Sequence, residues 1–208
     1  MKQQQVHTVS DWFLNDKPAG RYDHAIDEIR KQRDRGAAII ATSILEEHLL
    51  DAIQARLNRH DATEKKVFNG YGPLATFSAR IDLGLLLGLY PEEGHTKLHL
   101  IRRIRNNFAH SMHPISFKSQ RGDCNKLRKA RGSYREMNKW VDATLNKVQA
   151  IPIRLGMYRS STNPRTQFIR AIQEMCFHLT VQTLVGNSWR DWTKENNCSA
   201  QPATKSAD

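Results

Sequence analysis

The sequence predicts an all-α fold. Between about residues 23 and 193, apolar side chains recur three and four positions apart, a spacing that places them on one side of a helix. No segment shows the sustained apolar–polar alternation between turns that would indicate a β-hairpin. The predicted helices cover approximately residues 23–34, 36–58, 74–89, 93–110, 119–130, 133–149 and 164–186.

The chain is expected to form one folded domain between two polar ends. Its 208 residues are enough to bury a hydrophobic core without a disulfide or a metal ion. Residues 1–22 are polar and contain Pro18 and Gly20, and residues 194–208 are small and polar, so both segments are expected to be loosely held tails. The folded domain is therefore expected to span residues 23–193.

Two predicted helices carry the charges that are candidates for structural ion pairs. The segment 37–57 has apolar side chains almost all the way round, which indicates a central helix with Glu46 among them. The segment 74–90 is also core-forming, and its only charges are Arg80 and Asp82. Because a buried carboxylate needs a partner, we expect these three side chains to take part in ion pairs.

The helix predicted over residues 93–110 has an apolar face and a polar face, and one charged residue lies on the apolar side. On a helical wheel its core stripe consists of Leu98, Leu100, Ile101, Ile104 and Phe108. The opposite face gathers His99, Arg103, Asn106 and His110. Arg105 falls inside the apolar arc and is expected to face inward. Pro114 restricts the residue before it, so the helix is expected to end near His110.

Positive charge is concentrated in the middle of the chain. Residues 97–135 hold eleven Lys or Arg against the single acid Asp123, whereas the rest of the chain has 21 basic and 20 acidic residues. Such a segment favours a polyanionic partner, and RNA, DNA and an acidic protein surface all fit, as does a solvated face without a fixed partner. The candidate nucleic-acid-binding residues are Arg103, His113, Lys126, Arg128, Lys129 and Arg131.

Arg105 and His110 could act together on RNA. A histidine at a helix C-terminus can take the proton from a ribose 2′-OH or protonate the leaving 5′-oxygen, while an arginine stabilises the charged phosphorane, all without a metal. The alternative is that Arg105 neutralises Glu46 or Asp82 in the core and His110 only caps the helix. The two residues are about 140° apart on an ideal helix, so either the helix ends at His110 or two chains share a site.

Neither a metal site nor a cofactor site is expected. Cys124, Cys176 and Cys198 are far apart and lack a CxxC spacing, which disfavours both a disulfide framework and a zinc site and fits a reducing cytoplasm. The nine histidines show no metal-ligand pattern with carboxylates or cysteines. Trp189 and Trp192 are expected to pack against the protein.

No segment is expected to enter a membrane. The N-terminal residues lack the apolar stretch of a secretory signal, and no segment has the run of about 18 to 20 apolar residues that a bilayer span requires. We therefore expect a cytoplasmic protein.

Three segments resemble the mannitol operon repressor (MltR-like) family. They are "ILEEHLLDAI", "GPLATFSARIDLGLLLGL" and "IRRIRNNFAHSMHPISF", in the family's order and spacing, and the resemblance covers residues 37–128. It implies a compact helical bundle without a DNA-reading helix-turn-helix. In addition, "RNNFAH", residues 105–110, is similar to the R-x4-6-H signature of HEPN domains, including the polar residue that follows the arginine. The expected fold is thus a HEPN-like helical bundle with additional C-terminal helices.

The HEPN resemblance implies roles for three residues. Arg105 would stabilise the phosphate, Asn106 would position it and His110 would act as acid or base. Many HEPN proteins are metal-independent RNA endonucleases that dimerise, with both copies of the motif lining one cleft. The resemblance thus implies a homodimeric ribonuclease, as a toxin or phage-defence effector, that leaves 2′,3′-cyclic phosphate ends and has a protein partner such as an antitoxin.

The mannitol-repressor resemblance leaves a different function open. It implies a non-enzymatic transcriptional regulator that acts through a protein partner or a weak nucleic-acid contact. A third alternative is an RNA-binding or antitoxin-like relative without activity. Residues 131–208 lie beyond the matched segments, and their role is open.

Overall fold

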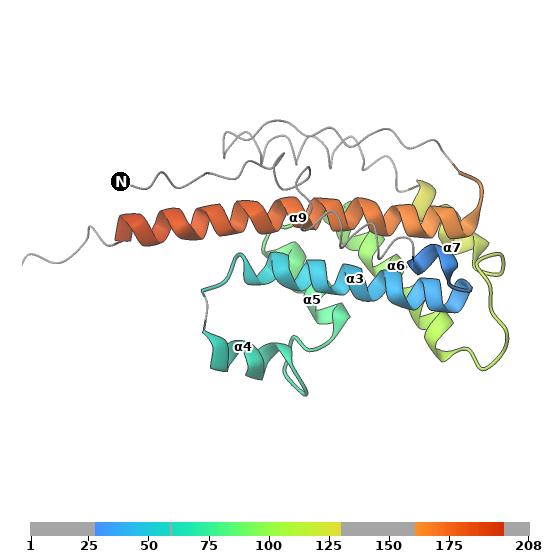
Figure 1. The fold of residues 1–208 in the computed structure, drawn as a ribbon, viewed down its shortest axis with the longest axis horizontal. Coiled ribbons are helices and arrows are strands. Elements are labelled where there is room, and N and C mark those ends of the chain that lie inside the picture. Colours follow the sequence, from blue (N-terminus) through green and yellow to red (C-terminus); the bar gives the residue numbers. More distant parts are fainter. Residues whose placement is uncertain (1–27, 59, 130–160, 198–208) are drawn as a thin grey trace, which may run out of the picture.

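The structure, a computed structural model, describes residues 28–58, 60–129 and 161–197, and this part of the chain contains helices and no strand (Figure 1). The expected all-α fold is therefore confirmed. The principal helices are α3 (Asp34–Gln54), α4 (Asp61–Phe68), α5 (Phe77–Leu86), α6 (Glu92–His110), α7 (Arg121–Lys129) and α9 (Pro164–Asn197).

Most helix boundaries lie within a few residues of the predicted ones. Helix α5 begins three residues later than predicted because the Thr76 hydroxyl caps it, accepting a hydrogen bond from the backbone N–H of Ala79 at 3.2 Å. Helix α9 continues to Asn197, beyond both its predicted end at 186 and the predicted domain end at 193. A helical turn at residues 28–31 is separated from α3, whereas one helix was predicted over 23–34.

Three predicted segments lie wholly or in part outside the residues that the structure describes. They are the N-terminal tail, residues 1–22, the helix over residues 133–149, and residues 198–208 of the C-terminal tail.

Helix α4 is absent from the predicted helices. Its sequence DATEKKVF offers an apolar pair only at its end, so hydrophobic periodicity could not reveal it. Local capping stabilises it instead: His60 Nδ1 accepts from the Thr63 N–H at 3.3 Å, and the Glu64 carboxylate accepts from the His60 N–H at 3.2 Å.

Helices α3 and α9 lie side by side and run in the same direction (Figure 1). Where both begin, the Arg165 guanidinium of α9 donates to the Asp34 carboxylate of α3 at 3.0 Å. Further along, Arg56, just after α3, donates to the Gln182 side chain of α9 at 2.7 Å. These two bonds, at either end of the shared length, set the register of the pair.

Helix α6 runs in the opposite direction to α3 and packs against α3, α5, α7 and α9. The residues that follow it return to the beginning of α3, where the Arg35 guanidinium donates to the carbonyls of Ser111 at 2.8 Å and His113 at 3.2 Å. The Phe117 N–H donates to the Asp34 carboxylate at 2.9 Å. The C-terminal end of α6 is thus held beside the N-terminal end of α3.

The hydrophobic core has α3 at its centre, as predicted. This helix packs on α5, α6 and α9, and its fully buried residues form one arc that covers a little less than half of its circumference. A second part of the core is aromatic: Phe117 lies between Phe108 of α6 and Phe168 of α9, with ring centroids 4.7 and 5.2 Å away. Among the described helices, none has the length and apolarity required to cross a membrane.

Tyr90 fixes how α5 lies against the start of α6. Its hydroxyl donates to the Ile81 carbonyl at 2.7 Å, and its ring passes directly over Gly84. A Cβ at position 84 would overlap the tyrosine hydroxyl, so only glycine allows this close approach. The contact sets the position of the α5 residues that face the first turns of α6.

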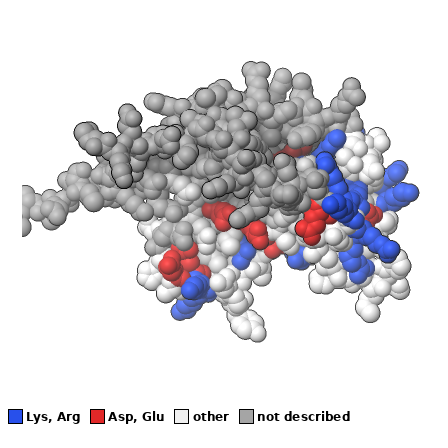
Figure 2. Space-filling model, viewed as in Figure 1, with Lys and Arg blue, Asp and Glu red and all other residues white. Residues whose placement is uncertain are grey.

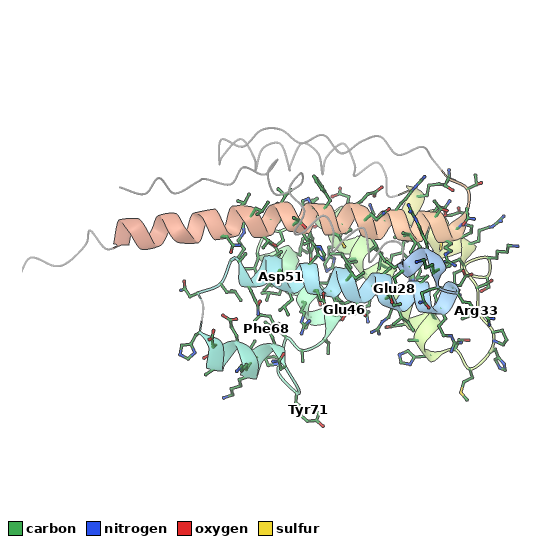
Figure 3. The ribbon with its side chains drawn as sticks, in the orientation of Figure 1. Glu28, Arg33, Glu46, Asp51, Phe68 and Tyr71 are labelled. Carbon is green, nitrogen blue, oxygen red and sulfur yellow. The ribbon has the colours of Figure 1, made fainter. Side chains whose placement is uncertain are left out.

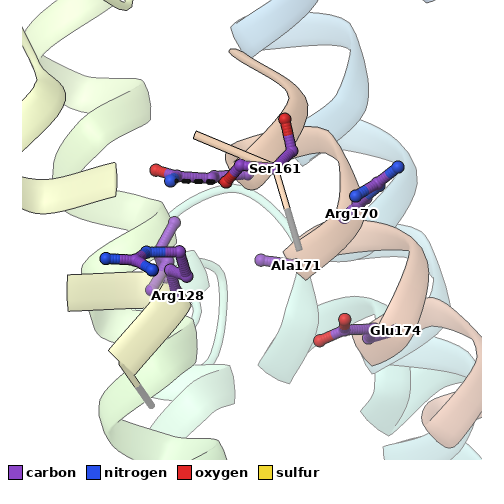
Figure 4. A pocket seen from close by; sticks show the side chains of 7 residues that line it. Arg128, Ser161, Arg170, Ala171 and Glu174 are labelled. Carbon is purple, nitrogen blue, oxygen red and sulfur yellow. Dashed lines mark hydrogen bonds between the residues drawn. The ribbon is translucent and has the colours of Figure 1, made fainter. Parts of the chain in front are cut away.

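A fully buried ion pair joins α6 to α9. Lys97 Nζ donates to Glu174 Oε2 at 2.6 Å, and the two side chains are 1% and 5% exposed. Figure 4 shows Glu174 projecting away from α9 toward the neighbouring helices. Two charges so far from water are tolerated only together, because either one alone would lack a partner.

We predict that removing one member of this pair destabilises the protein far more than removing both. Lys97→Met should lower the free energy of unfolding by about 3 to 5 kcal/mol, because it leaves the Glu174 carboxylate buried without a counter-charge. The double variant Lys97→Met/Glu174→Leu should recover most of that loss. Urea unfolding followed by circular dichroism measures both, and equal stability of the two variants would contradict the prediction.

His178 is a buried neutral histidine. Its Nε2 lies 2.7 Å from the Leu89 carbonyl and therefore carries the proton of that hydrogen bond. Burial lowers the pKa of His178 to about 4, since the charged imidazolium would lose its hydration.

This pKa predicts a loss of stability in acid. In the unfolded chain His178 binds a proton at its ordinary pKa of 6.5, and in the folded chain only near 4. The contribution of neutral His178 to the free energy of unfolding is therefore complete above pH 6.5 and is lost as the pH falls toward 4. The loss should be about 3 kcal/mol. His178→Gln keeps a donor for the carbonyl, and its free energy of unfolding should depend less steeply on pH. If the free energies of unfolding of the variant and of the unaltered protein changed equally with pH, His178 would not titrate in this way.

Candidate functional site

A basic groove runs along α6. It has a volume of about 630 Å³ and is open to solvent. Its polar lining includes His99, Arg102, Arg103, Asn106, Asn107 and Lys126, the last from α7. The predicted polar face of this helix is therefore confirmed for three of its four residues, His99, Arg103 and Asn106.

Asp123 organises the groove wall. Its Oδ1 accepts from Arg103 Nη2 at 3.0 Å and from Lys126 Nζ at 3.1 Å, so the only acid in the basic segment joins one cation of α6 to one of α7. Both cationic side chains are more than half exposed. Two positive charges share one negative charge, and the wall keeps a net positive charge that suits a phosphate backbone.

Arg105 is held by two neighbours on different helices. Its Nη2 lies 3.8 Å from Glu46 Oε1 on α3, and its Nη1 donates to Asn106 Oδ1 at 3.0 Å. The guanidinium is half-buried, and its Nε has no hydrogen-bond partner among the described residues. The side chain thus starts from the core side of α6 and reaches back to a residue on the polar face.

Glu46 is the core-facing carboxylate that the sequence predicted, midway along α3 (Figure 3). Burial raises the pKa of Glu46, and the nearby charges of Arg105 and Arg80 oppose that rise. The hydrogen bonds of Arg80 go to backbone carbonyls, with Nε donating to Leu74 and Nη2 to Phe68, each at 2.9 Å. Arg80 therefore holds the connection between α4 and α5 in addition to its electrostatic effect on Glu46.

Asp82 does not lie in the core. It is 58% exposed, and its Oδ1 lies 2.8 Å from His95 Nε2 and 3.0 Å from His99 Nε2. Its partners are therefore two histidines and not an arginine. The hydrogen bond from His95 is the largest cause that lowers the pKa of Asp82, followed by the hydrogen bond from His99 and the charges of the two rings.

The expectation that no histidine falls in a metal-ligand pattern is wrong for this cluster. Asp82, His95 and His99 bring one ligand atom each to within 4.8 Å of the others. The two histidines are four residues apart in "HTKLH", a spacing that places them on one face of a helix and that could have revealed them. The carboxylate comes from another helix, so only the packing of α5 on α6 identifies it.

His110 is the last residue of α6, as predicted. Ser111 follows with an extended backbone, and its N–H still bonds to the Asn107 carbonyl at 3.1 Å. His110 and His113 are both exposed, and the Ser111 hydroxyl donates to the His113 carbonyl at 2.9 Å. Figure 2 shows Lys and Arg side chains gathered at the end of the molecule where α3 and α9 begin, which is also where Arg35 holds the residues after α6.

Two other predicted phosphate-binding residues, His113 and Arg128, do not line the groove. Arg128 is exposed on α7 and borders a different cavity of only about 20 Å³, together with Arg170 and Glu174 of α9 (Figure 4). The side chain of Lys129 and the whole of Arg131 lie outside the described part of the chain. The structure thus brings Arg103 and Lys126 together and leaves Arg128 apart from them.

The cysteines that the structure describes are free, buried thiols. Burial raises the pKa of Cys124 to about 12 and also raises the pKa of Cys176. Both are therefore protonated and unreactive near neutral pH. Cys198 and the side chains of Trp189 and Trp192 lie outside the described residues.

Comparison of the chain with family models, with curated proteins and with solved structures gives no match in any of the three. The resemblances to the mannitol operon repressor family and to HEPN domains stay predictions from the sequence.

The raised pKa of Glu46 leads to a prediction about stability. An acid whose pKa is higher in the folded than in the unfolded chain destabilises the fold wherever it is ionised, and this effect disappears as the pH falls below the unfolded value of 4.5. Glu46→Gln should therefore be at least as stable as the unaltered protein at pH 7.5, with no difference at pH 3.5. Urea unfolding at the two pH values tests this, and a less stable variant at pH 7.5 would show that the Arg105 ion pair outweighs burial.

Proposed function

We propose that this chain is a metal-independent endoribonuclease of the HEPN type that leaves 2′,3′-cyclic phosphate ends. The observation that carries the proposal is the 3.0 Å hydrogen bond from Arg105 Nη1 to Asn106 Oδ1. It brings the guanidinium toward the polar face of α6, where His110 follows Asn106 after four residues and so projects from the same side.

The basic groove supplies binding for the RNA backbone. Arg103 and Lys126 lie beside each other through Asp123, and both expose donors to solvent. Arg102 also lines the groove. Contacts of this kind are made with phosphates rather than bases, so they orient a strand without selecting its sequence.

His110 supplies the acid–base chemistry in this proposal. It removes the proton from a ribose 2′-OH, the 2′-oxygen attacks the adjacent phosphorus, the bond from phosphorus to the 5′-oxygen breaks, and the imidazolium returns the proton to that leaving oxygen. Arg105 stabilises the negative charge that develops on the phosphorane, and Asn106 orients the Arg105 guanidinium. His110 is exposed at the C-terminus of α6, where a bound RNA strand can reach it.

We predict that RNA cleavage survives EDTA and is lost on substitution of His110. His110→Ala should lower the cleavage rate by about 100-fold or more, because it removes the proton acceptor. His60→Asn is a matched control, since it removes another exposed imidazole and retains a side chain that caps α4. Labelled RNA and end-group analysis measure rate and product, and full activity of His110→Ala would rule out the mechanism.

The role of Arg105 needs a different variant to test it, because Arg105→Ala alone leaves the Glu46 carboxylate without its counter-charge. The double variant Glu46→Gln/Arg105→Ala avoids this, and Glu46→Gln serves as its control. The double variant should lose about 100-fold or more in rate relative to that control, since it lacks the phosphorane-stabilising cation. Circular dichroism verifies that both are folded, and equal rates would remove Arg105 from the mechanism.

The proposal includes a homodimer in which two copies of the motif line one cleft. On an ideal helix Arg105 and His110 start about 140° apart, so in this dimer the guanidinium of one chain, turned toward the polar face by Asn106, acts with His110 of the partner subunit. Mixing His110→Ala with Glu46→Gln/Arg105→Ala then restores part of the activity, because some mixed dimers contain one intact Arg105 and one intact His110 in the shared cleft.

We further propose that the protein acts in the cytoplasm as a toxin or phage-defence effector and that a partner protein such as an antitoxin restrains it.

One observation favours the second function, a non-enzymatic regulator of the mannitol-repressor type. Arg105 is already paired with Glu46, and such a pair also fits a purely structural role. In that case RNA stays intact on long incubation, and the protein is recovered with a defined protein partner.

A further inference from the structure

We propose that Asp82, His95 and His99 form a binding site for a divalent transition-metal ion of the zinc type. Asp82 belongs to α5, and the two histidines lie one turn apart near the start of α6. The site is separate from Arg105, Asn106 and His110, so it does not depend on the proposed ribonuclease activity.

The three ligand atoms already converge on one point. Asp82 Oδ1 lies 2.8 Å from His95 Nε2 and 3.0 Å from His99 Nε2, and the two nitrogens are 3.1 Å apart. Three ligands at about 2.0 to 2.1 Å from a tetrahedral zinc ion would lie about 3.3 Å from one another. Movements of a few tenths of an ångström in exposed side chains are therefore sufficient to admit the ion.

The arrangement of protons also favours a cation at the centre. Both rings direct Nε2 toward the same carboxylate oxygen and toward each other. Without a metal, two Nε2–H groups would have to share one acceptor at close range, or one ring would have to change its tautomer. A metal ion replaces these protons and receives a lone pair from all three atoms, which is the donor set that zinc prefers.

The backbone holds the ligands from both sides. Lys97 lies between the two histidines in sequence and is buried against Glu174, so the opposite side of α6, with His95 and His99, faces outward. On α5, the packing of Tyr90 over Gly84 fixes the turn that carries Asp82. The cluster therefore joins two helices whose relative position the core has already set.

The site is accessible and keeps one position open. His95 and His99 are 26% and 29% exposed, and Asp82 is 58% exposed, so an ion can enter from solvent. Three protein ligands leave the fourth position of a tetrahedral ion to water or to an oxygen of another molecule. The two histidines also line the basic groove, which places the ion at its border.

Calorimetric titration of the untagged full chain with Zn²⁺ at pH 7.5 tests the site. We expect one ion per chain and a rise in the melting temperature with Zn²⁺. His99→Gln and Asp82→Asn should each weaken binding by about 100-fold or more and abolish the thermal shift. His60→Asn, which removes a histidine remote from the cluster in sequence, should bind as the unaltered chain does.

Three results would overturn the site: no binding to the unaltered chain, several ions per chain with equal affinity, or unchanged affinity in His99→Gln. Co²⁺ provides a second readout, because a four-coordinate site with two imidazoles gives intense visible absorption that the variants should lose. All three ligands are partly exposed, and circular dichroism confirms that each variant is folded. RNA cleavage by Asp82→Asn in EDTA reports on the ribonuclease proposal alone, so the failure of one proposal is distinguishable from that of the other.

Discussion

The buried ion pair between Lys97 and Glu174 determines which way α6 faces. A lysine that is 1% exposed can only point toward its carboxylate partner, so the rotation of α6 about its axis is fixed at that point. Residues two positions away on either side lie about 160° around the helix, which turns His95 and His99 outward. The groove and the histidine cluster both depend on this orientation.

The positive charge of the central segment is less available than the sequence implies. Lys97 is buried in the core, Arg105 lies beside Glu46, and Arg103 shares Asp123 with Lys126. The charges of Arg103 and Lys126, which a nucleic acid would meet in the groove, are held in place by a carboxylate. Such preorganisation limits the side-chain entropy lost on binding, at the cost of a weaker net attraction.

Sequence periodicity predicted the large helices because their apolar stripes are long and the core buries them. It also identified Glu46 as a carboxylate in need of a partner, whereas Pro114 predicted that α6 ends near His110. Helix α4 escaped prediction because caps rather than an apolar face stabilise it. The contact of Asp82 with two histidines escaped because it joins separate helices, and no period within one helix encodes how two helices pack.

Two kinds of chemistry are proposed for one helix, and its geometry keeps them apart. His99 and His110 are eleven residues apart in α6, which at 1.5 Å per residue is about 16 Å along the axis. An ion bound by His95 and His99 is therefore too far away to coordinate the phosphate beside which His110 transfers a proton. The metal would act by joining α5 to α6 at the border of the groove, while proton transfer takes place at the other end of the helix. Removing the metal should then alter stability without altering the acid–base step, which is why chelation separates the two roles.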